Sequence, residues 1–436
     1  METYCCSNGI DRISSLPVDI LHNVLSNLCI FDVIHMTVLS KRWKYICTTI
    51  PYFRFDSNFS DSDPHFEEFK EFIDTFLISH KTINLVRFIL SCSNMFETTD
   101  ILRFIEATTR RNVEQLVLWF SPCEPFELPH CLVTCESLQV LKLNLCGYIL
   151  KLPNHNHLGG FRQLKSLHLC NVELLDGHLT SCFFSECLLL EKLELCDCNL
   201  QHINLLYIAL KSLLYLTFDE GNYYDNCEIK ISCPALKFLT YKSPMPKDIV
   251  INNLFSIEYV NINFNDYDRN CDDDFGEKTE ILVHNMIKEI GLYKEACLPP
   301  ICFNKLKSLK LKLGVDEDCM QVMIRLLKYS PNLEVLKLWC DEMHDPEESI
   351  VCLDSHLKSI QLIGFKDEEN EIELVRFFLK NARVLEKFRI VWAGYALKSE
   401  EASKKVLNIP TTSSQVLWTI HDAKLKRWSD NWLGNC

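Results

Sequence analysis

Glycine is scarce in this chain, which has 12 glycines among 436 residues. Loops that cradle phosphates and turns that present a nucleophile need glycine to bring the backbone close to a ligand. The sequence contains no G-x-G-x-x-G, G-x-x-x-x-G-K-[ST], G-x-S-x-G or H-E-x-x-H pattern. These absences do not exclude an enzyme, but they remove the common routes to one, and we expect no cofactor.

Positive charge is also in short supply. Lysine and arginine number 45 against 59 aspartates and glutamates, which gives a net charge of -14 and a sequence pI near 5.5. A protein that binds a phosphate backbone usually carries the opposite sign. We therefore expect no nucleic-acid partner.

Long apolar runs are missing as well. A membrane span needs about 18 consecutive apolar residues, and the longest candidate, 205–216, is interrupted by Lys211. The first residues have neither the basic start nor the apolar stretch of a signal peptide. We expect no membrane partner and a cytoplasmic and/or nuclear location, where the 23 cysteines would stay reduced.

Three short helices are predicted within 11–51. Ser14 and Ser15 can cap the first, which has Pro17 in its first turn; Asp32 can cap the second; and Ser40 can cap the third, which stops near Pro51. Apolar residues recur in them at helical spacing: Ile20, Leu21, Val24, Leu25 and Leu28, then Val33, Met36 and Leu39, then Trp43 and Ile46. About forty residues are near the lower limit for an independent fold, so a partner that covered the surplus apolar face would stabilise this module.

This stretch closely resembles the F-box. The similarity lies in Leu16-Pro17, Ile20-Leu21, Val24-Leu25, Leu28 and the run from Leu39 to Trp43. The resemblance implies docking on a Skp-type adaptor, and through it on a cullin and a RING subunit, by apolar anchors in a groove. It assigns docking to Leu16, Pro17, Ile20, Leu21, Val24, Ser40, Arg42 and Trp43. For any single leucine, a place in a small three-helix core is the alternative.

A second pattern, L-x-x-L-x-L, begins near residue 113. The full leucine-rich-repeat template appears at Leu190, Leu193, Leu195, Cys198 and Leu200. Other clear copies centre on Leu141, Leu167, Leu216, Leu309 and Leu336, and weaker ones on Leu116, Leu239, Val260, Ile360 and Phe388. Alternate residues of a short strand point to opposite faces, so the leucines would enter a core that stacked repeats share. We predict an α/β solenoid whose strands line a curved inner wall.

The cysteines fit this arrangement. Cys146 and Cys198 stand where the template has Asn or Cys, in the turn after the strand, and many others are expected to be small buried apolar residues. A metal site at Cys196-x-Cys198 is a weak alternative, because no second pair stands at zinc spacing.

The C-terminal part resembles the FBD region that ends many plant F-box repeat proteins. A strand with Leu357, Ile360 and Leu362 is followed by an acidic loop over 367–371, a helix and a second strand at Phe388 and Ile390; the helix carries Leu374, Val375, Phe378 and Leu379. One more leucine-rich repeat is the alternative. The predicted organisation is an F-box at 11–51, a linker and irregular repeat start at 52–112, leucine-rich repeats at 113–345, an FBD-like region at 346–420 and a tail at 421–436.

Three polar clusters could carry chemistry. Residues 266–277 place acidic side chains at calcium-loop spacing, but Cys271 replaces the required glycine, so a solvated acidic loop is favoured. His155-Asn156-His157 lacks a further metal ligand. Outward positions of two neighbouring repeats form a basic strip beside an indole, which could hold an acidic peptide or an anionic small ligand: Lys310, Lys312, Lys337 and Trp339. An ordinary solvated face is the favoured alternative, and the strip is the best candidate in the sequence for a target-binding surface.

The sequence therefore predicts a non-catalytic substrate receptor of an SCF-type (Skp-cullin-F-box) ubiquitin ligase. The F-box would dock the adaptor, and the repeats would bind an unidentified protein substrate for ubiquitination by proximity. Two alternatives stay open: a scaffold or adaptor-sequestering protein outside any ligase, and an enzyme whose titratable residues converge in one pocket.

Overall fold

The computed structural model describes the chain in segments, within which all statements below fall. They are residues 13, 15–57, 65–80, 82, 84–153, 161–219, 226–243, 246–252, 254–264, 303–312, 323–324, 326–339, 350–366, 369–393, 405–413 and 416–421. The chain divides into two compact units, Met1–Leu200 and Gln201–Cys436, and each is described by itself.

The first unit opens with helices. They are α1 (Val18–Leu25), α2 (Ile30–His35), the 3₁₀ helix η1 (Met36–Val38) and α3 (Lys41–Thr49). Ser40 caps α3 as predicted, because its Oγ accepts a hydrogen bond from the Trp43 amide at 3.2 Å. The other two capping predictions are wrong: α1 follows Pro17 without a side-chain cap, and Asp32 lies inside the first turn of α2, which follows Cys29.

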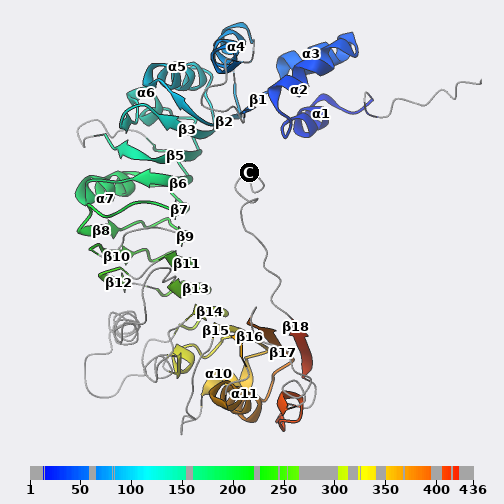
Figure 1. Ribbon diagram of the computed structural model, residues 1–436, viewed down its shortest axis with the longest axis vertical. Helices are drawn as coiled ribbons and strands as arrows, with labels where there is room; N and C mark the ends of the chain where they lie inside the picture. The colour runs from blue at the N-terminus through cyan, green and yellow to red at the C-terminus, as the bar shows by residue number, and fades with distance from the viewer. Residues whose placement is uncertain are drawn as a thin grey trace, which may run out of the picture. The chain divides into compact units, whose positions relative to one another are not determined.

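A parallel sheet fills the rest of this unit (Figure 1). Its strands are β1 (Tyr52–Ser57), β2 (Arg87–Phe96), β3 (Gln115–Pro122), β5 (Val140–Lys151), β6 (Ser166–Glu173) and β7 (Lys192–Cys196), and β4 (Phe126–Glu127) pairs with β5. Helices α4 (His65–Ser79), α5 (Thr98–Thr109), α6 (His130–Val133) and α7 (Gly177–Glu186) lie in the connections. Each strand pairs in parallel with the next one in this order, as stacked repeats require.

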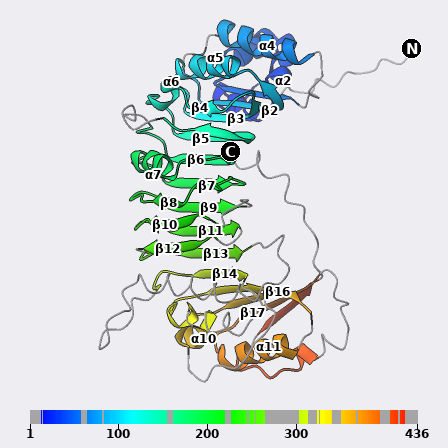
Figure 2. The ribbon, with the colours of Figure 1, turned by 60° about the vertical axis from the view of Figure 1, so that its left-hand side comes forward.

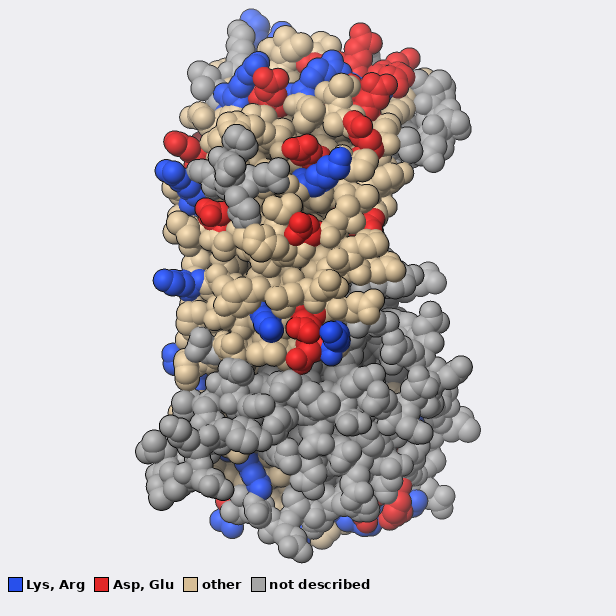
Figure 3. Space-filling model, turned by 90° about the vertical axis from the view of Figure 1, so that its left-hand side faces the viewer, with Lys and Arg blue, Asp and Glu red and all other residues tan. Residues whose placement is uncertain are grey.

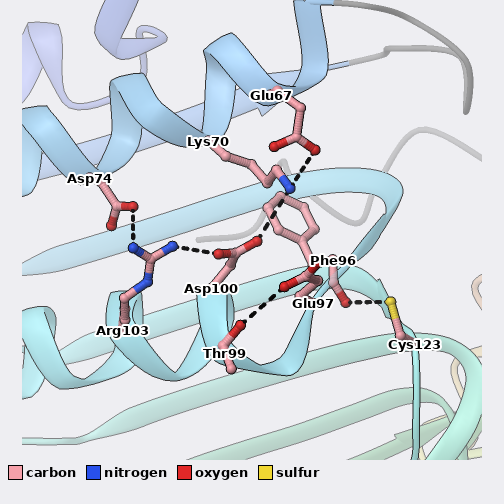
Figure 4. A network of polar contacts seen from close by, with 9 residues as sticks. All are labelled: Glu67, Lys70, Asp74, Phe96, Glu97, Thr99, Asp100, Arg103 and Cys123. Carbon is pink, nitrogen blue, oxygen red and sulfur yellow. Dashed lines mark hydrogen bonds and ion pairs between the residues drawn. The ribbon is translucent and has the colours of Figure 1, made fainter.

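We predicted the stretch 52–112 as a linker and the irregular start of the repeats, and the structure shows regular elements there. It holds two strands and two helices that start the sheet, and charged residues join α4 to α5 (Figure 4). Lys70 Nζ lies 2.6 Å from Glu67 and 3.3 Å from the buried Asp100, while Arg103 bridges Asp74 at 2.9 Å and Asp100. The sequence did not reveal the sheet here because these repeats carry Phe and Ile in place of most leucines.

The predicted repeat strands are confirmed. In the first unit, Leu141, Leu167 and Leu193 stand opposite one another in register and are fully buried. The backbone before each strand adds a second ladder, since Lys165 N donates to Gln139 O and Glu191 N donates to Lys165 O, both at 2.8 Å.

The two cysteines that the repeat template predicted in turns lie in different places. Cys198 is buried after β7, as the template predicts. Cys146 lies instead inside β5, half-buried at a register shift, with a φ of 53° and its amide bonded to Asn144 Oδ1 at 2.9 Å. Leu145 takes the buried place beside it. Eight of the fifteen described cysteines are buried, and burial raises the pKa of the Cys187 thiol to about 12, so these thiols act as small apolar residues.

The second unit contains two parallel sheets (Figure 2). The long one runs β9 (Tyr215–Asp219), β11 (Phe238–Ser243), β13 (Tyr259–Phe264), β14 (Ser308–Lys312), β15 (Val335–Trp339), β16 (Ser359–Phe365), β17 (Lys387–Trp392) and β18 (Leu417–His421). The short one is β8 (Leu205–Ile208), β10 (Glu228–Ser232) and β12 (Asp248–Asn252), which alternate with β9, β11 and β13 along the chain. Every second residue of these strands is buried. Here a strand takes the place that helices hold in the first unit.

The C-terminal elements follow the predicted order. Helices α10 (Val351–Ser355) and α11 (Glu369–Asn381) flank β16, and Leu374, Val375, Phe378 and Leu379 of α11 are buried. The acidic stretch is partly helical: Glu371 is buried in α11, and its carboxylate accepts the Lys366 amide at 2.8 and 3.1 Å. Gly364 has a φ of 85° at the bulge of β16, a conformation that favours glycine.

Candidate functional site

The first helix presents two faces. Leu21 and Leu25 are buried, with Leu21 0% exposed, whereas Ile20 and Val24 lie four residues apart on the opposite side, and Val24 is 57% exposed. Two exposed aliphatic side chains one helical turn apart form a continuous apolar strip. Such a strip is costly in water unless another protein covers it.

A second exposed apolar group lies at the junction of η1 and α3. Val38 is 85% exposed, and Leu39 and Tyr45 are also exposed. The sequence placed Leu39 on the same helix as Val33 and Met36, but α2 ends at His35 and the chain continues as the 3₁₀ helix η1 before Leu39.

The residues assigned to docking divide by burial. Pro17, Ile20, Val24, Ser40 and Arg42 are exposed and Leu16 is half-buried, whereas Leu21 and Trp43 lie in the helical core. Arg42 Nη2 donates to the Leu16 carbonyl at 2.5 Å, which fastens the segment before α1 to α3. Leu21 and Trp43 can therefore support a docking surface only by shaping it from beneath. The docking assignments stay predictions.

The helical module rests on the start of the sheet. The buried Arg87 of β2 donates from Nη2 to the Ser26 carbonyl at 2.9 Å, just after α1, and its guanidinium stacks over Tyr52, 5.6 Å from the ring centre. Phe31 of α2 stacks on Phe72 of α4 with a centroid separation of 4.5 Å. The module thus uses one side for the sheet and leaves Ile20, Val24 and Val38 exposed.

The predicted basic strip lies on the outer face of the second unit's long sheet, meaning the face opposite its leucine core. Lys310 of β14 pairs in register with Lys337 of β15, and Lys312 with Trp339. Lys310 Nζ lies 4.9 Å from the Trp339 ring centre, a cation–π contact. The side chain of Lys312 lies outside the described residues. Burial, then repulsion from Lys242 and Lys337, lowers the pKa of Lys310.

The sequence reasoning missed two residues of this face. Arg389 of β17 continues the line of Lys310 and Lys337 through Gln361, and Asn261 of β13 precedes it. Both stand between two core residues of a strand, so the alternation that revealed Lys310 could have revealed them. Weaker leucine patterns in β13 and β17 concealed them.

The outer face of the first unit carries a different group. His168 of β6 is buried, and its Nδ1 lies 3.4 Å from Glu194 Oε2. Burial outweighs the attraction of Glu194 and lowers the pKa of His168 to about 4, with Lys142 and Lys192 acting in the same direction as burial. The imidazole is therefore neutral at pH 7.

The structure does not describe the other two polar clusters of the sequence. Residues 266–277 and 155–157 lie outside the described residues. Among the residues that the structure does describe, no group of three or more His, Cys, Asp or Glu side chains could hold a metal ion, and no helix is long and apolar enough to span a membrane. On the face drawn in Figure 3, basic and acidic side chains are interspersed.

Three segments of the chain match known protein families. Residues 13–55 match the F-box domain, 101–230 match the family "FBD-associated F-box protein At5g56370, LRR repeats", and 345–390 match the FBD family. The chain combines an F-box, leucine-rich repeats and an FBD region.

Relatives share this combination along most of the chain. The Arabidopsis thaliana F-box/FBD/LRR-repeat protein At3g52680 is 29% identical over 92% of this chain and 90% of its own length. F-box/FBD/LRR-repeat protein At5g56420 is 28% identical over 85% and 89%, and F-box/LRR-repeat protein 13 is 26% identical over 94% and 97%, both from the same plant. These domains and names suggest an F-box substrate receptor. An F-box implies a Skp-type adaptor as partner, and leucine-rich repeats imply a protein substrate.

Proposed function

We propose that this protein is the substrate-recognition subunit of an SCF-type ubiquitin ligase in the cytoplasm or nucleus, without catalytic residues of its own. Its F-box would dock a Skp-type adaptor and, through it, a cullin and a RING subunit. Its repeats would hold a target protein close to a ubiquitin-carrying enzyme, so that tethering raises the local concentration of target lysines.

One observation carries the docking half of this proposal. Ile20, Val24, Val38 and Leu39 are exposed on a module whose core residues Leu21, Leu25, Val33 and Ile46 are buried. Clustered exposed apolar residues typically mark a protein interface, and anchors of this kind dominate binding energy. Ser40 and Arg42 are also exposed, which suits a polar rim, and the exposed Pro17 adds to the apolar surface.

The target-binding half rests on the outer face of the second unit. Lys310, Lys337 and Trp339 are half-buried there, and together with Lys312 they are the residues we propose for substrate contact. In a curved solenoid the face opposite the leucine core is the concave wall, which would present these residues to a target.

The test is co-purification of the full chain with a Skp-type adaptor. We expect Ile20→Asp combined with Val24→Asp to abolish capture, because two charges would be desolvated at the interface centre. Ile78→Asp is the matched control, since Ile78 is 83% exposed on α4, outside the F-box, and should leave capture unchanged. Equal capture by all three proteins would refute the docking assignment. A further immunoprecipitation for cullin separates a ligase subunit from a protein that only sequesters the adaptor.

A further inference from the structure

The outer face of the long sheet in the second unit is depleted of acidic residues. Strands β11, β13, β14, β15, β16, β17 and β18 align in register, and their outer positions contain no Asp or Glu. The same positions contain six basic residues: Lys242, Lys310, Lys312, Lys337, Lys387 and Arg389. The whole chain carries a net charge of -14, so this basic face is a local reversal of the protein's charge.

Among the side chains that the structure describes, few of these cations pair with a carboxylate. Lys242 Nζ pairs with Asp219 of the neighbouring β9 at 2.7 Å. No described carboxylate forms an ion pair with Lys310, Lys337 or Arg389. Lys310 is instead held over the Trp339 ring, and burial with two neighbouring lysines lowers its pKa. Cations that are close together and partly desolvated favour an anionic ligand.

A second observation concerns the side-chain amide of Asn261. It is 3% exposed, and its Oδ1 is fully buried without a hydrogen-bond partner. Asn261 stands beside Lys310 in register, and Asn263, whose Oδ1 also lacks a partner, stands two residues further along β13. A buried acceptor of this kind costs free energy unless a ligand supplies a donor. A peptide backbone supplies N–H groups, whereas inorganic phosphate at neutral pH offers mainly acceptors.

The geometry also sets the length of the ligand. Asn261, Lys310, Lys337, Gln361 and Arg389 form one line across five neighbouring strands, which we call the outer row. Strands lie about 4.8 Å apart, so the outer row is about 19 Å long. An extended peptide advances about 3.3 Å per residue, and six to seven residues would span it.

We propose that the outer row binds an extended acidic peptide segment of a partner protein, with Asn261 bonded to its backbone and Lys310, Lys337 and Arg389 to its Asp and Glu side chains. This inference rests on the proposed function for its setting, since it names the chemistry of the target segment. Asn261 and Arg389 add to the residues proposed above and distinguish a peptide from a small anion.

Fluorescence anisotropy on the full chain tests this proposal. The probe is a fluorescein-labelled eight-residue peptide in which Glu alternates with Ser, and the comparison peptide has Gln in place of Glu. We expect the Glu peptide to bind at least tenfold more tightly, and its affinity to fall as salt is raised from 50 to 300 mM, since exposed charge pairs are screened over about 8 Å at physiological ionic strength. Equal binding of the two peptides would overturn the proposal.

Two variants locate the contacts. Lys337→Glu with Arg389→Glu should weaken binding of the Glu peptide at least thirtyfold. Lys305→Glu with Lys358→Glu makes the same change in net charge at exposed residues before β14 and β16, and should weaken binding by less than threefold. Asn261→Leu should weaken it about fivefold to tenfold, because the loss of one hydrogen bond is worth about that factor. Equal effects of the two charge-reversal pairs would contradict the assignment to the outer row.

Other ligands are outcomes of the same assay. A phosphoserine peptide that binds when the Glu peptide does not, or a ten-nucleotide oligouridylate that binds as tightly as the Glu peptide, would overturn the proposal of a carboxylate-bearing peptide. Adaptor capture is measured on the same proteins. The outer-row variants should keep it, and Ile20→Asp with Val24→Asp should lose it while keeping peptide binding, so that failure of one hypothesis is seen apart from failure of the other.

Discussion

The helical module at 15–50 and the strands β5 to β7 differ in how far their apolar side chains are buried. In the strands, Leu141, Leu167 and Leu193 occupy equivalent positions of neighbouring repeats, stand in register and are buried. In the module, Ile20, Val24 and Val38 have no such neighbour and stay exposed. Each repeat is covered by an equivalent neighbouring repeat, while the helical module leaves part of its apolar surface exposed.

The largest expected effect contrasts truncation in the two regions. Leu193→Ala should lower the free energy of unfolding by about 2–5 kcal/mol, because it leaves a cavity in a fully buried site. Val24→Ala should change it by less than about 0.5 kcal/mol, as expected for exposed side chains. Urea denaturation followed by circular dichroism measures both. Comparable losses of unfolding free energy would mean that Val24 is covered within the chain, and the contrast in burial between the two regions would be refuted.

The polar side of the sheet offers a pH-dependent effect. His168 has a folded-state pKa of about 4, below the ordinary value of 6.5, so the unfolded chain binds its proton more readily between these values. The contribution of neutral His168 to the free energy of unfolding is fully present above pH 6.5 and is lost as the pH falls towards 4. The total loss is on the order of 3 kcal/mol. Denaturation midpoints at pH 4.5 and 7 should show this loss, and His168→Gln should remove most of it. A pH slope that is unchanged in His168→Gln would assign it to other groups.

The joint between the two regions is tested at Arg87. Arg87→Ala removes a buried hydrogen bond to Ser26 O and the stacking on Tyr52, and should destabilise the seating of the helices by about 1.5–3 kcal/mol. Hydrogen exchange should show faster exchange for amides of 18–49, with β5 to β7 unchanged. Arg87→Lys is the conservative control and should recover little, since lysine lacks the planar fork. Uniform loss of protection would mean that Arg87 serves the sheet rather than the joint.

The smallest expected effect lies within the module. Ser40→Ala removes the cap of α3 and should cost about 1 kcal/mol. Thr48→Ala is the control, because its exposed hydroxyl bonds only to Tyr45 O inside the same helix. Thermal unfolding of the two variants measures the difference. If both behave alike, the cap contributes nothing to this helix.

The repeat strands were predictable because their signal is local. A leucine at every second position fixes which face of a strand is buried, and the 26-residue steps from Leu141 to Leu167 and from Leu167 to Leu193 fix parallel stacking. The Ser40 cap and the apolar helix of the FBD region were equally readable. The first strands were not, because Phe53, Phe55 and Phe88 replace the leucines of the template.

By itself, the sequence determined the leucine-bearing strands of the repeats and the apolar face of the FBD helix, since both follow from spacing along a few residues. Only the tertiary structure decided that Leu21 is buried while Val24 is exposed, that Cys146 lies in a strand, and that Asn261 and Arg389 share one line with Lys310 and Lys337. The reason is physical. Register between strands depends on how whole repeats stack across connections of unequal length. The spacing of residues within one repeat does not encode that stacking.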